Sequence, residues 1–310
     1  EQWILRELVN STLSDVSLKR GLSVACIEGI IDRHVQQQVD WSTVPALESI
    51  GIDEIALKKG HKDFVVMVSG VTAQHEKCIL AVLPDRKKET VKSFLETIPL
   101  QQRAHVRQVC IDMNEGYRNA VQETLTHVQV VVDRFHVAKH YRDCADKARK
   151  DEMKRLKKNL PEQEYAQLKG AMWAFRKPWT ALSEEQQTVL LRLFQLAPIL
   201  QAVYVQREVL TGIFESRINK AQAENALAQW LERITALGLI CFAAFETTLN
   251  NWRDHITNYF VGRKTSGFVE GLNNKIKVIK RRCYGIYNLG RLFQHIWLDV
   301  QGRKVLFAEH

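Results

Sequence analysis

The first 40 residues carry the hydrophobic pattern of short helices. Apolar spacing predicts helices over 13–20 and 24–34, with Gly21 as the break between them and Ser23 as the N-cap of the second. A glycine at a positive-φ turn and apolar anchors beneath the second helix are features of a helix-turn-helix. Many helical hairpins share this pattern without touching DNA, so a structural hairpin and a DNA-reading unit both stay open.

From residue 49 the hydrophobic pattern takes the period of β-strands. Apolar and β-branched runs predict five strands, at 50–56, 64–71, 77–83, 106–111 and 128–132. Helical patterns at 88–98 and 117–125 separate the last three strands. Three strands in hairpin order, followed by helix, strand, helix and strand, predict a mixed five-stranded α/β sheet. This is the element order of the ribonuclease-H-like fold, in which the first and fourth strands are neighbours.

Beyond residue 133 the strand patterns stop, and helical patterns punctuated by prolines, including one over 162–175, extend to about residue 251. We interpret this stretch as a large all-α insertion between the sheet and the last part of the chain. The predicted segments are a helix-turn-helix at 1–40, a connector at 41–48, the first part of the ribonuclease-H-like core at 49–137, the all-α insertion at 138–255 and the second part of the core at 256–310.

Residues 265–285 place one carboxylate and a run of basic residues on a single predicted helix, which Thr265 or Ser266 can cap. The stripe that faces a core consists of Leu272, Ile276, Ile279 and Cys283. A second stripe consists of Glu270, Asn274, Lys277 and Arg281. A solvated charged face is the ordinary explanation of such a helix. An acid at one end of a basic track also suits a metal-held carboxylate beside a polyanion.

The composition agrees with an anionic partner. The chain has 44 Lys and Arg against 35 Asp and Glu, a net charge of +9. No apolar run approaches the roughly 18 residues of a membrane-spanning helix, and no secretory segment opens the chain. Six scattered cysteines without a C-x-x-C pair indicate neither a zinc knuckle nor a disulfide framework, so we expect a reduced, cytoplasmic compartment. The chain begins without methionine and in mid-pattern, so we expect that an upstream segment was removed.

Three acids form the candidate site. Asp53 and Asp112 lie at the ends of strands predicted to be adjacent, and Glu270 opens the basic helix. Mg²⁺ prefers oxygen ligands, and two such ions about 3.5–4 Å apart can act on the attacking and leaving oxygens of a phosphodiester. Asp53, on the central strand, is the best candidate for a ligand that bridges both ions. Taken singly, each acid is more often a surface or capping residue than a functional one, and Glu54 and Asp133 compete with Asp53 and Asp112.

Several motifs in a fixed order carry a family resemblance. They are GIDE at 51–54, KKGH at 58–61, IDMNEGY at 111–117, DRFHV at 133–137 and EGLNNKIKVIKRRCYG at 270–285. Together, over nearly the whole chain, they resemble the DDE transposases, most closely the ISL-three group of bacterial insertion-sequence transposases. The resemblance implies that Asp53, Asp112 and Glu270 are the catalytic ligands of two Mg²⁺ or Mn²⁺ ions. It also implies accessory roles for Asp133 and His136, which match a D-x-x-H element.

The resemblance extends to DNA binding. The helix-turn-helix resembles the DNA-binding unit of the family, and Ser23 and Cys26 at the start of its second helix are the expected base-reading residues. The expected contacts from the basic helix are Asn274, Lys277, Lys280, Arg281 and Arg282. The cysteine-rich zinc-binding segment expected upstream in this group is absent from the sequence, which leaves zinc binding open.

We therefore expect a Mg²⁺-dependent transposase that cleaves DNA and transfers strands of an insertion sequence. Its partners would be double-stranded DNA at the element ends and at the target, bound by a homodimer or higher oligomer at the bacterial nucleoid. One alternative is a ribonuclease-H-like nuclease or resolvase without strand transfer. Another is a domesticated, non-catalytic DNA-binding regulator, against which the intact set of three acids argues.

Overall fold

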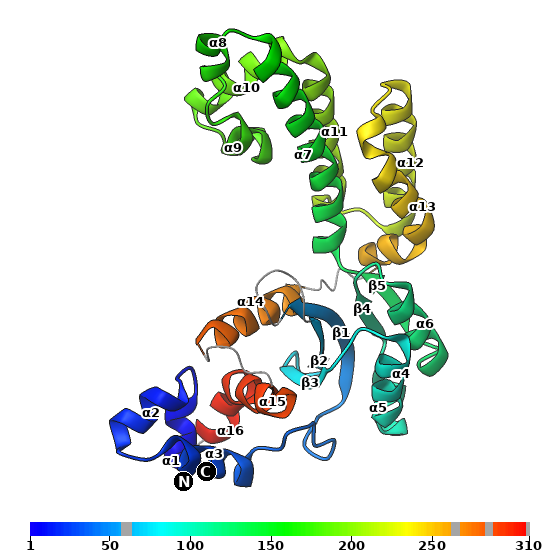
Figure 1. The fold of residues 1–310 in the computed structure, drawn as a ribbon. Helices are drawn as coiled ribbons and strands as arrows, with labels where there is room; N and C mark the ends of the chain where they lie inside the picture. Colours follow the sequence, from blue (N-terminus) through cyan, green and yellow to red (C-terminus); the bar gives the residue numbers. More distant parts are fainter. Residues whose placement is uncertain (57–63, 262–266, 283–287, 308–310) are drawn as a thin grey trace. The chain divides into compact units, whose positions relative to one another are not determined.

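The computed structural model describes residues 1–56, 64–261, 267–282 and 288–307 (Figure 1). Within 267–282, the side chains of 267–270, 273 and 280 are outside the description. The predicted features that fall outside the described residues are the KKGH motif, the caps Thr265 and Ser266, Cys283, and the side chains of Glu270 and Lys280.

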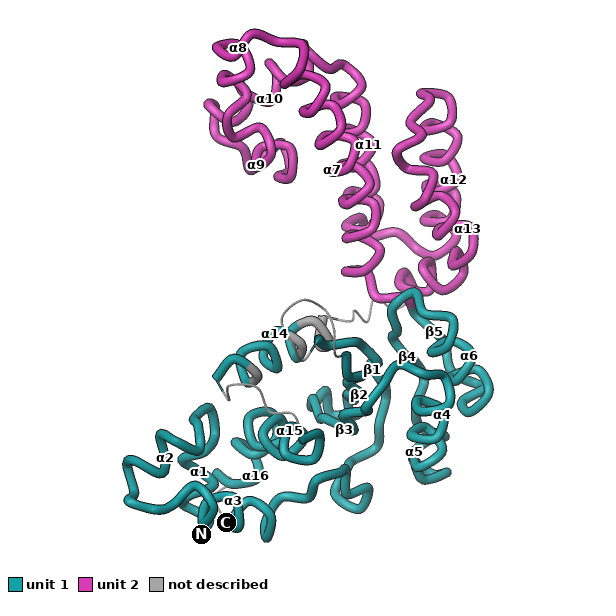
Figure 2. The backbone as a smooth tube through the Cα atoms, viewed as in Figure 1, with its two compact units in different colours: residues 1–131, 265–310 teal, residues 132–264 magenta. Residues whose placement is uncertain are grey.

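The chain divides into two compact units (Figure 2). The first consists of Glu1–Val131 and Thr265–His310, and the second of Val132–Lys264. The first unit contains the sheet together with the N-terminal and C-terminal helices, so segments from both ends of the sequence build one body.

A mixed five-stranded sheet forms the centre of the first unit. Its strands are β1 (Leu47–Ala56), β2 (Phe64–Thr72), β3 (Lys77–Leu83), β4 (Gln108–Ile111) and β5 (Gln129–Val132). Their order is β3-β2-β1-β4-β5, with β1 antiparallel to β2, β2 antiparallel to β3, and β1 parallel to β4. The predicted mixed sheet and the predicted adjacency of the first and fourth strands are both confirmed.

Three helices lie between β3 and β5 in the chain: α4 (Lys88–Thr97), α5 (Leu100–His105) and α6 (Glu115–Thr124). Figure 1 shows them beside β4 and β5. Asn114 begins α6, because its side chain accepts hydrogen bonds from the backbone N–H groups of Gly116 and Tyr117. The short helix α5 was not predicted, since its six residues hold too few apolar positions to show a helical period.

Helices from the end of the chain cover the face of β1–β3 that carries Ile55 and Met67. These are α14 (Gly267–Arg282), α15 (Leu289–Trp297), a π-helical turn (Leu298–Gly302) and α16 (Arg303–Phe307). The shared core contains Ile55, Met67 and Ile79 from the sheet, Leu272, Ile276 and Ile279 from α14, and Leu292, Phe293 and Ile296 from α15. The predicted apolar stripe of α14 is therefore confirmed at its three described positions. Gln301 also accepts a hydrogen bond from the backbone N–H of Ile79, 3.0 Å away, on the edge strand β3.

The N-terminal helices are α1 (Gln2–Leu8), α2 (Leu13–Arg20) and α3 (Val24–His34). The bounds of α2 and α3 are those predicted from the sequence. Gly21 joins them in the left-handed region at φ 64°, where glycine adopts the turn without steric cost, and Ser23 caps α3 by accepting from the N–H of Cys26. Apolar side chains of all three helices share a core with Leu298 of the π-helical turn.

From Arg134 to Phe260, every described element is a helix. The α-helices are α7 (Arg134–Asn159), α8 (Glu162–Ala166), α9 (Ala171–Arg176), α10 (Glu184–Leu196), α11 (Pro198–Glu215), α12 (Lys220–Ala236) and α13 (Ala243–Thr257). The sequence pattern predicted one helical segment over 162–175, whereas the structure has two. The turn residues 167–170 separate them, and Gly170, with a φ of 90°, directly precedes α9.

One buried carboxylate joins the separate parts of the first unit. Asp299 lies in the π-helical turn and is 3% exposed. Its Oδ1 accepts from the backbone N–H of Asn10 at 2.7 Å, and its Oδ2 pairs with Arg282 at the end of α14. Its backbone oxygen accepts from Lys275. The N-terminal helices, α14 and the C-terminal helices therefore meet at this residue.

The Asp299→Ala substitution should lower the free energy of unfolding by about 3 kcal/mol, because it leaves the largely buried Arg282 without its counter-charge. Urea denaturation followed by circular dichroism measures the change. The matched control is Glu76→Ala, which removes a carboxylate paired with the exposed Lys304 and should cost less than about 1 kcal/mol. Equal, small losses for both variants would show that the Asp299 pair does not stabilise the fold.

Candidate active site

Asp53 lies near the end of β1 on the face of the sheet that α14 covers. Successive side chains of a strand point to opposite faces, so Asp53 shares its face with Ile55, which packs against α14 and α15. Its register partner on β2, Met67, belongs to the same core. Asp53 is 9% exposed, and its Oδ1 accepts from the N–H of Glu54 at 2.7 Å. The carboxylate is therefore held in a mostly enclosed position.

Asp112 follows β4 directly, one residue beyond the last pair of its parallel ladder with β1. Ile52 pairs with Ile111 in the parallel ladder, which brings Asp53 and Asp112 to the next, neighbouring positions. Oδ1 of Asp112 is buried, although the residue as a whole is partly exposed. The two aspartates that the sequence selected thus come from neighbouring strand ends, as the strand order predicted.

Glu54, the competitor of Asp53, lies on the other face of the sheet. It accepts a hydrogen bond from the hydroxyl of Tyr117 on α6 at 2.9 Å, and Arg86 lies 3.6 Å from its second oxygen. Burial raises the pKa of the Tyr117 hydroxyl, and the Glu54 carboxylate raises it further. The hydroxyl therefore stays protonated and donates to Glu54. This contact explains Glu54 as a residue that joins β1 to α6.

The third acid, Glu270, is carried by α14, and its side chain lies outside the described residues. The helix itself is placed by Leu272, Ile276 and Ile279, which pack on the face that also holds Asp53. Glu270 precedes Leu272 by two residues. The helix that carries Glu270 therefore covers the face of the sheet that holds Asp53. That the Glu270 carboxylate lies close to the two aspartates stays a prediction.

The donor set suits a divalent ion. Two carboxylates at neighbouring strand ends offer the oxygen ligands that Mg²⁺ prefers. Among the described side chains, no group of three His, Cys, Asp or Glu residues is arranged to hold a metal ion, and Glu270 is not among them. The chemistry of Asp53 and Asp112 fits such an ion, and their role as its ligands stays a prediction.

The accessory residues Asp133 and His136 belong to the helical unit. Asp133 is 5% exposed and caps α7, because its Oδ1 accepts from the N–H of Phe135 at 2.7 Å. His136 is partly exposed, and its ring lies edge-on to that of Phe135 at a centroid distance of 5.7 Å. The cap accounts for Asp133 locally, and an accessory role of either residue stays a prediction.

The predicted DNA contacts on α14 fall into different environments. Asn274, Lys277 and Arg281 are exposed on the side of the helix away from the core. Arg282 is only 20% exposed in its side chain and pairs with Asp299, so its guanidinium is engaged within the protein. The side chain of Lys280 is outside the described residues. On α3, Ser23 and Cys26 are both exposed, but the Ser23 hydroxyl serves as the helix cap.

Two further residues, Asp299 in the C-terminal helices and Tyr117 beside Glu54, carry signals in the sequence itself. Asp299 is an acid within the apolar run Ile296–Val300, a pattern that indicates a buried and therefore paired charge. Tyr117 lies in the IDMNEGY motif, and its polar end needed a partner once the helix placed the ring in the core.

Comparison with known proteins identifies the family of the chain. A profile of the ISL3 group of DDE transposases, described as "Transposase", matches residues 50–296. The chain is 31% identical over 250 residues to the transposase for insertion sequence element IS1001 of Bordetella parapertussis, covering 80% of this chain and 59% of that protein. It is 21% identical over 277 residues to the transposase for IS1557 of Mycobacterium tuberculosis, covering 83% of this chain and 61% of that protein.

The chain belongs to the DDE transposase family of the ISL3 group, since the profile matches well over half of its residues. The resemblance seen in the sequence motifs is thereby confirmed. The chain spans about three fifths of the length of the curated relatives it matches. None of its described helices is both long enough and apolar enough to cross a membrane.

Changing Asp53 to Asn should reduce Mg²⁺-dependent DNA cleavage to background while DNA affinity stays equal or increases. The amide removes a metal ligand and also removes repulsion of the phosphate. Cleavage of labelled DNA on denaturing gels and a filter-binding titration measure the two quantities. The control is Glu54→Gln, on the opposite face, which should keep most of the cleavage activity. Loss of cleavage in Glu54→Gln but not in Asp53→Asn would assign the ligand role to Glu54.

Proposed function

We propose that this chain catalyses DNA cleavage and strand transfer of an insertion sequence by two-metal phosphoryl transfer, with Asp53, Asp112 and Glu270 as the ligands. The observation that carries the proposal is the parallel register of β1 and β4, whose last pair, Ile52 and Ile111, directly precedes Asp53 and Asp112. Helix α14 packs on the face that holds Asp53. The order β3-β2-β1-β4-β5 supports a ribonuclease-H-like core.

Each of the three acids would have its own role in this reaction. Bound divalent ions would supply Lewis-acid activation of the attacking oxygen and charge stabilisation at the leaving oxygen. Asp53, on the central strand and nearly buried, is suited to bridge two ions. Asp112 would supply a second carboxylate from the neighbouring strand, and Glu270 on α14 would supply the third. Water and later a DNA 3′-hydroxyl would be the attacking groups.

DNA would be held by two surfaces. Lys277 and Arg281 on the exposed side of α14 would bind backbone phosphates, which gives affinity without sequence preference. Helix α3 begins with a run of exposed residues, Ser23–Cys26, that is available to a DNA groove. Because Ser23 is the helix cap, Cys26 is the better of the two predicted base-reading residues. The partner DNA would be the element ends and the target, bound by a homodimer or higher oligomer in the bacterial cytoplasm at the nucleoid.

Two alternatives use the same fold. A nuclease or resolvase would need the same acids but would not join strands, and a DNA-binding regulator would need none of them. The neighbouring positions of Asp53 and Asp112 favour an enzyme over a regulator. An assay with element-end DNA, Mg²⁺ and a supercoiled target plasmid tests the proposal. Joined products support the transposase, cleavage without joining supports the nuclease, and binding without cleavage supports the regulator.

Changing Lys277 and Arg281 together to Ala should weaken binding to element ends and to unrelated DNA by similar factors. The slope of log affinity against log salt concentration should fall in magnitude by up to about two, one for each lost phosphate contact. Titrations at several salt concentrations measure both effects. The control changes the exposed Lys157 and Lys158 of α7 to Ala, which removes the same charge. If both double variants behave alike, the basic face of α14 is only a solvated surface.

Changing Cys26 to Gln should weaken binding to element ends about tenfold or more and leave binding to random DNA unchanged, because an altered base contact carries about 1–3 kcal/mol of discrimination. Competition between the two DNAs in a gel-shift experiment measures the ratio. Ser14→Gln, at an exposed position of α2, is the matched control and should leave the ratio unchanged. An unchanged ratio in Cys26→Gln would identify residues 13–34 as a structural hairpin.

A further inference from the structure

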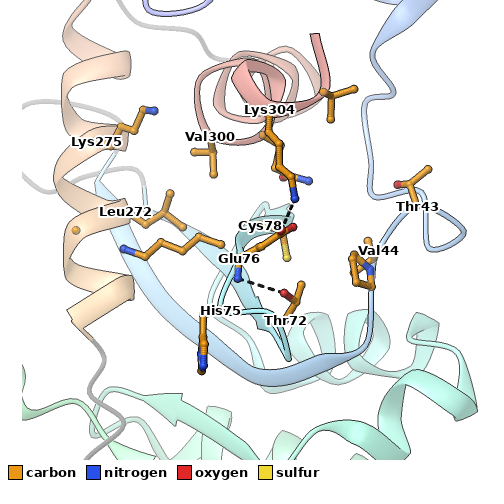
Figure 3. A pocket seen from close by; sticks show the side chains of 15 residues that line it. Thr43, Val44, Thr72, His75, Glu76, Cys78, Leu272, Lys275, Val300 and Lys304 are labelled. Atoms are coloured by element: carbon orange, nitrogen blue, oxygen red, sulfur yellow. Dashed lines mark hydrogen bonds and ion pairs between the residues drawn. The ribbon is translucent and has the colours of Figure 1, made fainter. Parts of the chain in front are cut away.

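A cavity of about 700 Å³ opens in the first unit between the start of β3, helix α14 and the C-terminal helices (Figure 3). Figure 3 shows Leu272 and Lys275 of α14 on one side, Thr43 and Val44 on the opposite side, and Val300 and Lys304 between them. The size lies within the range of about 300–1,000 Å³ that is usual for small-molecule sites.

The lining combines apolar surface with an excess of positive charge. Aliphatic side chains come from Val44, Pro45, Leu272, Val300 and Val305. Three lysines, Lys77, Lys275 and Lys304, face one glutamate, Glu76. Such a lining complements a ligand that has both an apolar ring and an anionic group, because the ring then contacts aliphatic side chains and the anion contacts lysines.

The three lysines differ in the contacts that they make within the protein. Lys304 forms an ion pair with Glu76, and Lys275 donates to the backbone oxygen of Asp299. Nζ of Lys77 lies 4.0 Å from the position that a Cβ atom on Gly271 would occupy, so this ammonium group reaches the first half of α14. Lys77 is therefore the cation best placed to bind an anion held in the cavity beside that helix.

The cavity is continuous with the proposed catalytic helix. Gly271 and Leu272, two of its lining residues, follow Glu270 directly in the chain. Leu272 also packs with Ile55 and Met67 on the face of the sheet that holds Asp53. An anionic ligand in the cavity would therefore lie next to the helix that carries the proposed third acid.

We propose that this cavity receives one nucleotide of the substrate DNA, turned out of the base stack near the cleaved bond, with Lys77 bound to its phosphate. The proposal rests on the proposed function, which makes DNA the anionic substrate. Stacked, paired bases present only their edges to a protein, so a cavity with apolar walls admits a base only after it leaves the stack. Turning a base out costs a few kcal/mol, and contact with the apolar lining and the lysine would offset that cost.

The test uses element-end DNA that carries 2-aminopurine at one position at a time on either side of the cleaved bond. The fluorescence of this base increases when it leaves the stack. In Ca²⁺, we expect a several-fold increase at one position when the wild-type chain binds. The Asp53→Asn variant should show the same increase, because unstacking depends on the cavity and not on cleavage.

Two variants test the cavity, one by removing the charge of Lys77 and one by filling the space at Val305. Lys77→Ala should reduce the fluorescence increase, weaken end binding about fivefold to tenfold and lower the salt slope by about one, whereas Lys77→Arg should restore most of each effect. Val305→Trp fills the cavity at an exposed position without changing charge, and should abolish the increase. Lys92→Ala is the charge-matched control on α4 and should behave like the wild type.

The outcomes separate this inference from the proposed function. A lack of increase at every position, or an increase that survives both Lys77→Ala and Val305→Trp, would overturn the cavity assignment even if the chain cleaves and joins DNA. A position-specific increase that both variants remove would support it even if no cleavage occurs, in which case the transposase mechanism would fail alone. Displacement of the signal by free deoxynucleoside monophosphate at millimolar concentration, but not by the nucleoside, would show that the phosphate is part of what the cavity recognises. Displacement by both alike would overturn the role of Lys77.

Discussion

The arrangement of the first unit depends on one buried carboxylate. Asp299 binds the backbone of Asn10, the guanidinium of Arg282 and, through its own backbone oxygen, Lys275. A buried charge costs several kcal/mol unless its partners are in place, so the N-terminal helices and α14 are held where all these contacts form. The placement of α14, which carries Glu270, thus depends on a pair at the C-terminal end of that helix.

The side chains of α14 lie in three environments, because successive residues of a helix point in directions 100° apart. Its stripe of Leu272, Ile276 and Ile279 lies in the core, and Lys277 and Arg281 face solvent. Its remaining side, with Lys275, borders the cavity and the Asp299 contact. Core packing, DNA binding and the proposed nucleotide site would therefore be coupled rigidly through one element.

The pleat of β1 separates two acids that are adjacent in sequence. Asp53 points to the face covered by α14, whereas Glu54 points to α6 and accepts a hydrogen bond from Tyr117. A strand end that carries both acids can therefore support chemistry on one face and hold its neighbouring helix on the other. This division also explains why an interchange of the two residues would not be conservative.

The sequence by itself determined the elements and their order, because strand and helix periods are encoded within a few residues. It predicted α2, α3 and β3 at their observed bounds, the adjacency of β1 and β4, and the apolar stripe of α14. It missed α5 and the division of 162–175 into two helices, where the local patterns are too short. Only the tertiary structure decided the face of Glu54, the engagement of Arg282 and the cavity at Lys77. These features depend on which surfaces meet across the fold, as in the bond between Asn10 and Asp299, 289 positions apart, and no local pattern specifies such a meeting.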